Sequence, residues 1–411
     1  MSELSYLEKL LDGVEVEWLP LGKLGELVRG NGLPKSDFTE SGVPAIHYGQ
    51  IYTFYGLSTD TTKSFVSHET AKKLKKVNSG DVVITNTSEN FTDVGKALVY
   101  LGKEQAVTGG HATIFKPNST IIGKYFAYFT QTDSFANEKR KYSKGTKVID
   151  VSASDMAKII IPIPCPENPE KSLAIQSEIV RILDKFSALT AELTAELNMR
   201  KKQYNYYRDQ LLSFKEGEVE WKTLGEVAQY SKTRISFELL DERNYVGVDN
   251  LLQNRAGKSL SNHVPTSGKL TEFIPNDILI GNIRPYLKKI WQADCIGGTN
   301  GDVLVIRCID SSINTRYLYQ ILADDKFFEY NMQHAKGAKM PRGSKEDIMK
   351  YPIPVPPLTL QARIVEILNK FDTLTNSITE GLPREIELRQ KQYEYYRDLL
   401  FSFPKPETAS N

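Results

Sequence analysis

The sequence predicts an α+β protein in which two mixed α/β domains are separated by two long helices that form an antiparallel coiled coil. Three observations predict this fold. An internal repeat of roughly two hundred residues covers the 411-residue chain twice. Heptad-spaced apolar residues mark a long helix in each repeat, and short β-rich runs punctuated by Gly, Asn, Ser and Thr fill the remainder. The chain begins near the end of one repeat unit, so the units are arranged cyclically with pseudo-two-fold symmetry.

The repeat is clearest in two helical blocks. Residues 176–190 (QSEIVRILDKFSALT) and 361–375 (QARIVEILNKFDTLT) are identical at nine of fifteen positions. Residues 203–214 (QYNYYRDQLLSF) and 392–403 (QYEYYRDLLFSF) are identical at nine of twelve. Because each helix alone would leave an apolar stripe exposed, we expect the two helices to pack on each other. The predicted seam residues are Ile179, Ile182, Phe186, Leu189, Leu193, Ile364, Ile367, Phe371, Leu374 and Ile378.

Helix signals and composition shifts set the domain boundaries. Ser172 is the expected N-cap of a first helix over about 172–214, and Gly381 with Pro383 should break the second helix near 381–383. The predicted organisation is an N-terminal segment completing the distal helical region (1–17), a first mixed domain (18–164), a central region with the long helix (165–218), a second mixed domain (219–356), a distal helical region (357–403) and a disordered tail (404–411).

The two mixed domains are predicted to share a scaffold and to differ in surface. Strands are expected at 82–85, 96–100, 278–280 and 303–306, and helical patches at 68–77, 124–137 and 316–333. The domains align only at framework points, which are Asp81 with Asp277, Gly109-Gly110 with Gly297-Gly298, Gly145 and Lys147 with Gly337 and Lys339, and Asp155 with Asp347. Between those points the two sequences differ almost completely.

Composition and motifs argue against several functional classes. The 52 basic and 51 acidic residues nearly cancel, which excludes a polycationic coat for nucleic acid. Gly257-Lys258-Ser259 resembles the end of a P-loop, but position 252 is Leu, so the phosphate cradle cannot form. The five histidines lack metal-site spacing and are expected to be surface or packing residues. The chain is therefore predicted to have no catalytic residues, no metal and no cofactor of its own.

Loop residues supply the candidates for DNA binding. Basic residues recur, together with glycine, before the Pro-rich strand of each half, where they would neutralise phosphates. Amide, hydroxyl and arginine side chains after equivalent strands could read base edges, although such residues are also common in plain turns. The candidates are Tyr48, Gln50, Asn86, Thr87, Ser88, Lys141, Lys144, Lys147, Asn250, Asn254, Arg255, Asn282, Arg284, Lys336, Lys339 and Arg342.

A tyrosine-rich motif at each helix end indicates a docking surface. The pattern Y-x-Y-Y-R-D places aromatic rings on more than one face of the helix, which is more apolar area than one helix contact can bury. Tyrosine and arginine also dominate protein–protein hot spots, so partner docking is favoured over internal packing alone. The candidates are Tyr204, Tyr206, Tyr207, Arg208, Tyr393, Tyr395, Tyr396 and Arg397.

Three long segments resemble the specificity subunits of type I restriction-modification enzymes, in particular the type IC group. They are SYLEKLLDGVEVEWLPLG at the start, the central block IPIPCPENPEKSLAIQSEIVRILDKF with TAELTAELNMRKKQYNYYRDQLLSFKEGEVEWKTLGE, and the block RIVEILNKFDTLTNSITEGLPREIELRQKQYEYYRDLLFSFPKP. The resemblance implies two target recognition domains, each reading one half of a split site in double-stranded DNA. It also implies a subunit without chemistry of its own.

The same resemblance implies the partners. Two modification subunits would carry S-adenosylmethionine and methylate adenine N6, and two restriction subunits would add ATP- and Mg-dependent translocation and cleavage. The N-terminus lacks a signal-peptide pattern, no apolar stretch is long enough for a membrane span, and three cysteines show no CxxC spacing, so a cytoplasmic location without membrane contact is expected. The resemblance further implies that this location is bacterial and nucleoid-associated. The alternatives are a coiled-coil scaffold without base readout and a stand-alone nuclease or methyltransferase.

Overall fold

The computed structural model describes residue 10 and residues 13–215, 217–377 and 379–404. These residues form two compact units, the first comprising residues up to Leu189 and from Gln390 onward, the second Thr190–Arg389. The helix α8 (Pro169–Leu211) contributes its first part to one unit and its second part to the other. The predicted α+β class, with two repeated mixed domains and a long helix, is confirmed.

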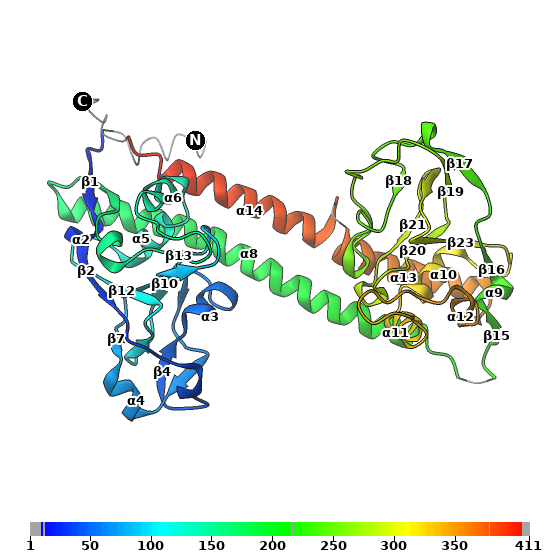
Figure 1. The fold of residues 1–411 in the computed structure, drawn as a ribbon, viewed down its shortest axis with the longest axis horizontal. Coiled ribbons are helices and arrows are strands. Elements are labelled where there is room, and N and C mark those ends of the chain that lie inside the picture. The colour runs from blue at the N-terminus through cyan, green and yellow to red at the C-terminus, as the bar shows by residue number, and fades with distance from the viewer. Residues whose placement is uncertain (1–9, 11–12, 216, 378, 405–411) are drawn as a thin grey trace. The chain divides into compact units, whose positions relative to one another are not determined.

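The mixed domain of the first unit has three layers (Figure 1). Its main sheet has the strand order β2 (Gly25–Arg29), β12 (Ala112–Pro117), β8 (Val82–Thr85), β10 (Ala97–Tyr100) and β5 (Ser58–Thr59). Its second sheet has the order β3 (Phe38–Thr39), β6 (Ser64–Val66), β4 (Val43–Ile46), β11 (Ala106–Thr108) and β7 (Lys75–Val77). The runs VVIT and ALVY of β8 and β10 are buried along their whole length because helices cover one face and the second sheet covers the other.

Helices and two short strand pairs complete this domain. The helices are α2 (Leu21–Leu24), α3 (Tyr48–Thr53), α4 (His68–Lys73), α5 (Gly123–Phe129), α6 (Asp133–Arg140) and α7 (Ala153–Met156). The strand pairs are β1 (Val16–Pro20) with β14 (Ile160–Pro164), and β9 (Thr87–Ser88) with β13 (Ile149–Asp150), both antiparallel. The aromatic side chains of α5 fill the core between the main sheet and α8.

The mixed domain of the second unit repeats this layering with different details. Its sheets have the orders β16 (Ala228–Tyr230), β23 (Val303–Cys308), β20 (Ile278–Gly281), β21 (Ile290–Gln292), and β17 (Arg234–Ser236), β19 (Lys269–Phe273), β22 (Gly297–Thr299), β18 (Tyr245–Val246). The pair β15 (Glu220–Thr223) and β24 (Pro352–Val355) corresponds to β1 and β14. Its helices are α9 (Leu224–Val227), α10 (Thr315–Leu322), α11 (Asp325–Gln333) and α12 (Lys345–Ile348), and α13 (Leu358–Asn376) belongs to the same unit. Helix α14 (Gly381–Leu400) belongs to the second unit up to Arg389 and to the first unit from Gln390.

The same glutamine contact fixes each mixed domain to its helix. In the first unit the buried Gln176 of α8 accepts a hydrogen bond from the Ile122 amide at 2.9 Å, just before α5. In the second unit the buried Gln361 of α13 accepts one from the Asn314 amide at 2.8 Å, just before α10. Because buried amides of this kind need partners, the contact specifies how each domain seats on its helix.

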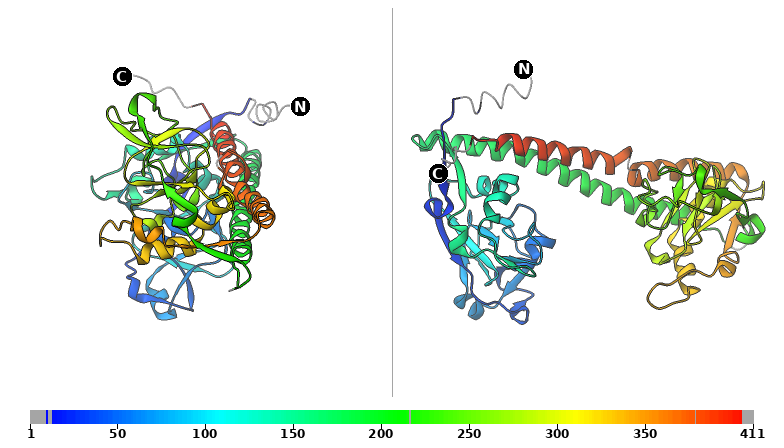
Figure 2. Two further views of the ribbon diagram at one scale, coloured as in Figure 1. Left: turned by 90° about the vertical axis from the view of Figure 1, so that its right-hand side faces the viewer. Right: turned by 45° about the horizontal axis from the view of Figure 1, so that its top comes forward.

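Helix pairing within each unit joins a seam residue to a tyrosine block. Phe186 of α8 stacks on Tyr396 of α14 at 5.1 Å, and the two helices lie side by side in both views of Figure 2. In the second unit, Phe371 of α13 stacks on Tyr204 of α8 at 5.8 Å and on Tyr207 at 5.5 Å. Contacts between a seam residue and a tyrosine block are what an antiparallel arrangement produces, because it places the early part of one repeated helix beside the late part of the other.

The predicted seam residues therefore pack against other partners than the seam of the second helix. Ile179 and Ile364 are buried in the cores of their own mixed domains, and Leu189 is exposed. Ile182, Leu193, Ile367 and Leu374 are half-buried, while Ile378 lies outside the described residues. The heptad spacing identified the apolar face, but the adjacent α/β domain covers much of that face.

Several element boundaries differ from the predicted ones. Helix α8 begins at Pro169, and Asn168 caps it by accepting a hydrogen bond from the Lys171 amide at 3.0 Å, while Ser172 is buried inside the first turn. The predicted patch 68–77 is helical only to Lys73, because Lys75–Val77 pairs with β11. The patches 124–137 and 316–333 each divide into two helices. The predicted tail lies outside the described residues, apart from Pro404.

Helices α13 and α14 are separated where the sequence contains Gly381. Gly381 has a φ of +78°, and a Cβ there would meet the Thr373 carbonyl oxygen at 2.4 Å, so the position requires glycine.

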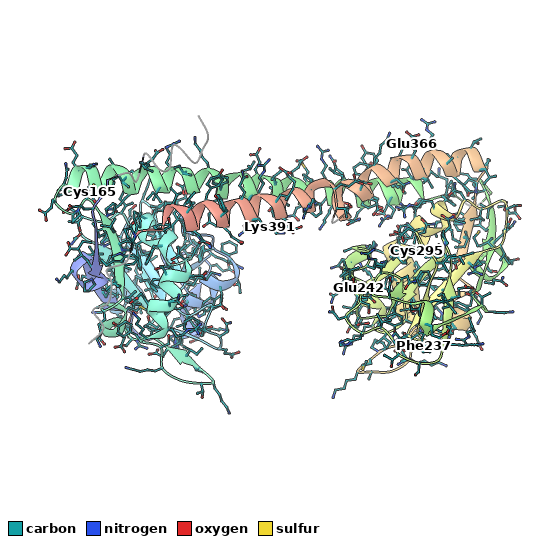
Figure 3. All side chains as sticks on the ribbon, turned by 90° about the horizontal axis from the view of Figure 1, so that it is seen from above. Cys165, Phe237, Glu242, Cys295, Glu366 and Lys391 are labelled. Atoms are coloured by element: carbon teal, nitrogen blue, oxygen red, sulfur yellow. The ribbon has the colours of Figure 1, made fainter. Side chains whose placement is uncertain are left out.

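Figure 3 shows Glu366 on the side of α13 that points away from the second mixed domain, with Phe237 at the opposite end of that domain. None of the described helices is long and apolar enough to cross a membrane.

Candidate nucleic-acid interface

In the first unit, the chain that leaves β8 forms a polar surface. Asn86 is fully buried, and its Oδ1 accepts a hydrogen bond from Thr113 Oγ1 at 2.8 Å. Its carbonyl accepts one from the Val151 amide at 2.9 Å. Asn86 is thus a structural anchor, which corrects its prediction as a base contact, and it positions the half-exposed Thr87 and Ser88 of β9 at the surface.

Helix α3 brings an aromatic side chain to this surface. The ring of Tyr48 lies 4.8 Å from that of His111, whose Nδ1 is 3.1 Å from Thr87 Oγ1. Tyr48, Thr87 and Ser88 therefore belong to one surface, joined by a histidine that was expected to be an ordinary surface or packing residue. Its place directly after the Gly109-Gly110 framework pair was the available signal. The side chain of Gln50 does not join this cluster, because its amide donates a hydrogen bond to Ser64 Oγ at 2.6 Å.

In the second unit, the chain that leaves β20 forms a tight, strained turn. Asn282 is buried, like its counterpart Asn86, so its side chain does not face outward, but its Oδ1 has no hydrogen-bond partner among the described residues. Arg284 and Lys288 have φ values of +52° and +51°, which is unusual for residues other than glycine and is often found at functional sites. Arg284 is exposed on this turn, and its amide donates to the Pro341 carbonyl at 2.7 Å. Tyr286, which sequence reasoning did not select, is half exposed beside it at 50%.

Two further candidates in this domain brace loops. Asn250 is buried, accepts a hydrogen bond from the Gly247 amide at 2.6 Å and donates to the Ser259 carbonyl at 3.0 Å. Arg255 pairs with Asp325 of α11. Both side chains are bonded within the domain, so neither is presented for a base contact in this structure. Asn254, next to Arg255, has a φ of +55° and contributes to the turn.

The predicted basic residues lie on, or just before, one hairpin loop in each domain. In the first domain, Lys144 pairs with Asp155 at 2.8 Å, and Lys141 pairs with Glu138 at 2.7 Å just before the loop. The Lys144 ammonium, by hydrogen bonding, holds the pKa of the Asp155 carboxyl well below its usual range. Lys147 is exposed at the tip of the loop.

The hairpin of the second domain has the same plan. Arg342 pairs with Asp302 at 2.8 Å, while Lys336 and Lys339 form no ion pair within the described part of the chain. Ile283, from the turn after β20, forms a β-bridge with Arg342. In the first domain, β9 pairs in the same way with β13. Each hairpin thus lies directly beside the surface residues that follow the central strand.

The tyrosine blocks divide into buried and exposed members. In the second unit, Tyr204 is buried and donates to Gln320 Oε1 at 3.0 Å, and the guanidinium of Arg208 lies 4.1 Å from the Tyr204 ring centroid. These two residues pack internally, which corrects their assignment to a partner interface. Tyr207 is partly covered by Phe371, and Tyr206 remains 61% exposed.

The block on α14 shows the same division. Tyr393 is buried and bonded to Gln131, so it too is removed from the predicted interface, and the Arg397 guanidinium lies 5.8 Å from its ring centroid. Tyr396 packs on Phe186, whereas Tyr395 is 55% exposed. Tyr206 and Tyr395 occupy equivalent positions in the repeat.

The described residues contain no group of three side chains suited to bind a metal ion. What the two units present instead is a paired set of polar and basic loops on a shared scaffold. Hydroxyl and guanidinium groups beside unpaired lysines are the chemistry of base and phosphate contact in DNA-binding proteins.

Comparisons with known proteins agree with this chemistry. The model of the family described as "Type I restriction modification DNA specificity domain" matches residues 13–200 and 216–388. The specificity subunit of the type I restriction enzyme EcoR124I/EcoR124II of Escherichia coli is 43% identical over 428 residues, covering 100% of both chains. The specificity subunit of the enzyme EcoprrI, also from E. coli, is 34% identical and covers 92% of this chain and 93% of its own.

Solved structures show the same fold. The S subunit of a type I restriction-modification system from M. genitalium superposes with a TM-score of 0.59 at 15% identity, covering 96% of this chain and 98% of its own. A chain from a study of complex assembly in a type I R-M system gives a TM-score of 0.52 at 17% identity, covering 94% and 97%. The chain therefore belongs to the family of type I restriction-modification DNA specificity subunits.

Proposed function

We propose that this chain reads a bipartite target in double-stranded DNA, with one half-site for each mixed domain, for a type I complex of the IC group. The observation that carries the proposal is the contrast between a repeated scaffold and different surfaces. Gln176 and Gln361 seat the two domains by the same contact. The surface after the central strand is Thr87-Ser88 in one domain and Arg284 with Tyr286 in the other.

Different side chains at equivalent places are what two different half-sites require. Hydroxyl groups bind several base edges, whereas arginine favours the O6 and N7 atoms of guanine. A scaffold without base readout would have no reason to vary this surface while keeping Asn86 and Asn282 beneath it. For this reason the direct-readout function is favoured over a coiled-coil scaffold alone.

The chemistry is assigned to partner subunits. Two modification subunits would bind S-adenosylmethionine and methylate adenine N6, and two restriction subunits would use ATP and Mg²⁺ to translocate and cleave DNA. The exposed Tyr206 and Tyr395 support docking of one modification subunit at each tyrosine block. The near-neutral charge of the chain, with 52 basic and 51 acidic residues, supports a division in which partners supply much of the phosphate neutralisation.

A domain exchange tests the proposal. Residues 18–164 are replaced by the equivalent domain of another specificity subunit, and the methylated motif of cells that also express the partner subunits is mapped. One half-site should change while the other is kept. An unchanged motif in a complex that still methylates DNA would favour the scaffold alternative. Methylation or cleavage by the purified chain with cofactors but without partners would contradict the assignment of chemistry to other subunits.

A further inference from the structure

The hairpin loops are the part of the two surfaces whose backbone is built in the same way in both domains. In the first domain, the amide and carbonyl groups of Lys144 and Asp150 exchange hydrogen bonds of 2.9 and 2.8 Å. In the second domain, Lys336 and Arg342 exchange two of 2.9 Å. Each hairpin contains a glycine in the left-handed region, with a φ of +98° for Gly145 in the first domain and +103° for Gly337 in the second. The same backbone is therefore built twice, between segments whose sequences differ.

Both hairpins present the same pair of chemical groups at their tips. The tip sequences are GTKV at 145–148 and GAKM at 337–340. Val148 and Met340 are 55% and 51% exposed, although both are apolar. Lys147 and Lys339, next to them, form no ion pair within the described ranges. Each tip thus combines a cation available for a ligand with an apolar side chain in water.

Each hairpin is also bonded to its domain at the base. Lys144 is paired with Asp155 in the first domain, and Arg342 with Asp302 in the second, both at 2.8 Å. The carbonyl of Asn86 accepts a hydrogen bond from the residue after the first hairpin at 2.9 Å, and that of Asn282 accepts the equivalent bond at 3.2 Å. In the first hairpin this leaves Lys147 at the tip for binding, and in the second it leaves Lys339 at the tip together with Lys336 at the base.

We propose that the two hairpin tips are a matched pair of sequence-independent clamps on the DNA backbone. Each lysine would contact a phosphate, and each apolar side chain would pack on a deoxyribose. This inference rests on the proposed function and adds a division of labour to it. The variable segments beside the hairpins meet bases that differ between half-sites, and the repeated hairpins meet the sugar-phosphate chain that both half-sites share.

The salt dependence of DNA binding tests the lysines. In the assembled complex with its modification subunits, Lys147→Gln and Lys339→Gln together should reduce the slope of log Kobs against log[salt] by about 0.9 for each lysine, because each phosphate contact releases counterions. The control is Lys171→Gln with Lys370→Gln, which removes the same charge from the long helices α8 and α13. That pair should leave the slope unchanged.

A tip exchange separates backbone contact from base readout. Thr146→Ala with Val148→Met converts the first tip into the second, and the methylated motif should stay the same at both half-sites. A changed half-site, or an unchanged salt slope in the lysine variant, would overturn the inference. Failure of the lysine variant to assemble with modification subunits in the absence of DNA would overturn it in favour of a protein contact. A wild-type complex that methylates no bipartite motif would instead refute the proposed function itself.

Discussion

Lys139 permits a quantitative test of packing beneath the first recognition surface. It lies on α6 with only 5% of its surface exposed, and its ammonium donates to the carbonyls of Phe91 at 2.9 Å and Val94 at 2.6 Å. These contacts hold the loop that follows β9. Burial lowers the pKa of Lys139 from 10.5 to about 8, and the nearby Asp93 offsets only part of that effect.

The lowered pKa makes the free energy of unfolding depend on pH. The unfolded chain binds the proton more tightly than the folded chain, so Lys139 destabilises the fold below its folded pKa and this cost disappears as pH rises toward 10.5. The full cost corresponds to about 3 kcal/mol. Between about pH 7 and about pH 9.5 the folded state should gain about 2 kcal/mol from this group.

The assay compares wild type with Lys139→Met in a background of Trp221→Phe and Trp291→Phe. Trp18, buried in the first unit, is then the single tryptophan and reports the unfolding of that unit in urea. Raised tyrosine pKa values are shared by all variants, so the difference from wild type isolates Lys139. Lys141→Met is the matched control, because this neighbouring lysine is exposed.

The expected result is a wild-type free energy of unfolding that rises with pH relative to Lys139→Met, by about 2 kcal/mol over this range. The Lys141→Met protein should follow wild type. A difference between wild type and Lys139→Met that stays constant from pH 7 to 9.5 would refute the reasoning, since it would show that the ammonium is not desolvated by folding.

Two further predictions concern the helices. A third TAEL copy inserted after Leu197 would lengthen α8 by about 6 Å and rotate its ends by about 40°. The unread spacer should grow by at most about two base pairs, at about 3.4 Å each, with both half-sites unchanged, and methylation mapping that found altered half-sites with the same spacer would contradict this. Tyr206→Ala with Tyr395→Ala should weaken binding of the modification subunits at least tenfold in a titration, because exposed tyrosines of this kind act as hot spots, while thermal stability stays close to wild type. Unaltered assembly would exclude the exposed tyrosines from the interface.

The sequence determined the architecture because the long repeat contains two copies of a helix whose apolar face has to be buried. Heptad spacing in both copies identified the apolar faces of the long helices, and the repeated positions of Gly145 with Lys147 and of Gly337 with Lys339 marked the basic loops. Burial of an apolar stripe depends on side-chain spacing along one chain, which is readable without coordinates. Fold class and repeated domains were therefore predictable.

Only the tertiary structure decided which polar residues face outward. Asn86, Asn250 and Arg255 looked like base-reading residues, yet each forms a hydrogen bond or ion pair inside its domain. A polar side chain in a loop has the same sequence signature whether it braces a turn or faces a ligand. The difference lies in partners such as Thr113 and Asp325, which are distant along the chain, so it appears only once the chain has folded.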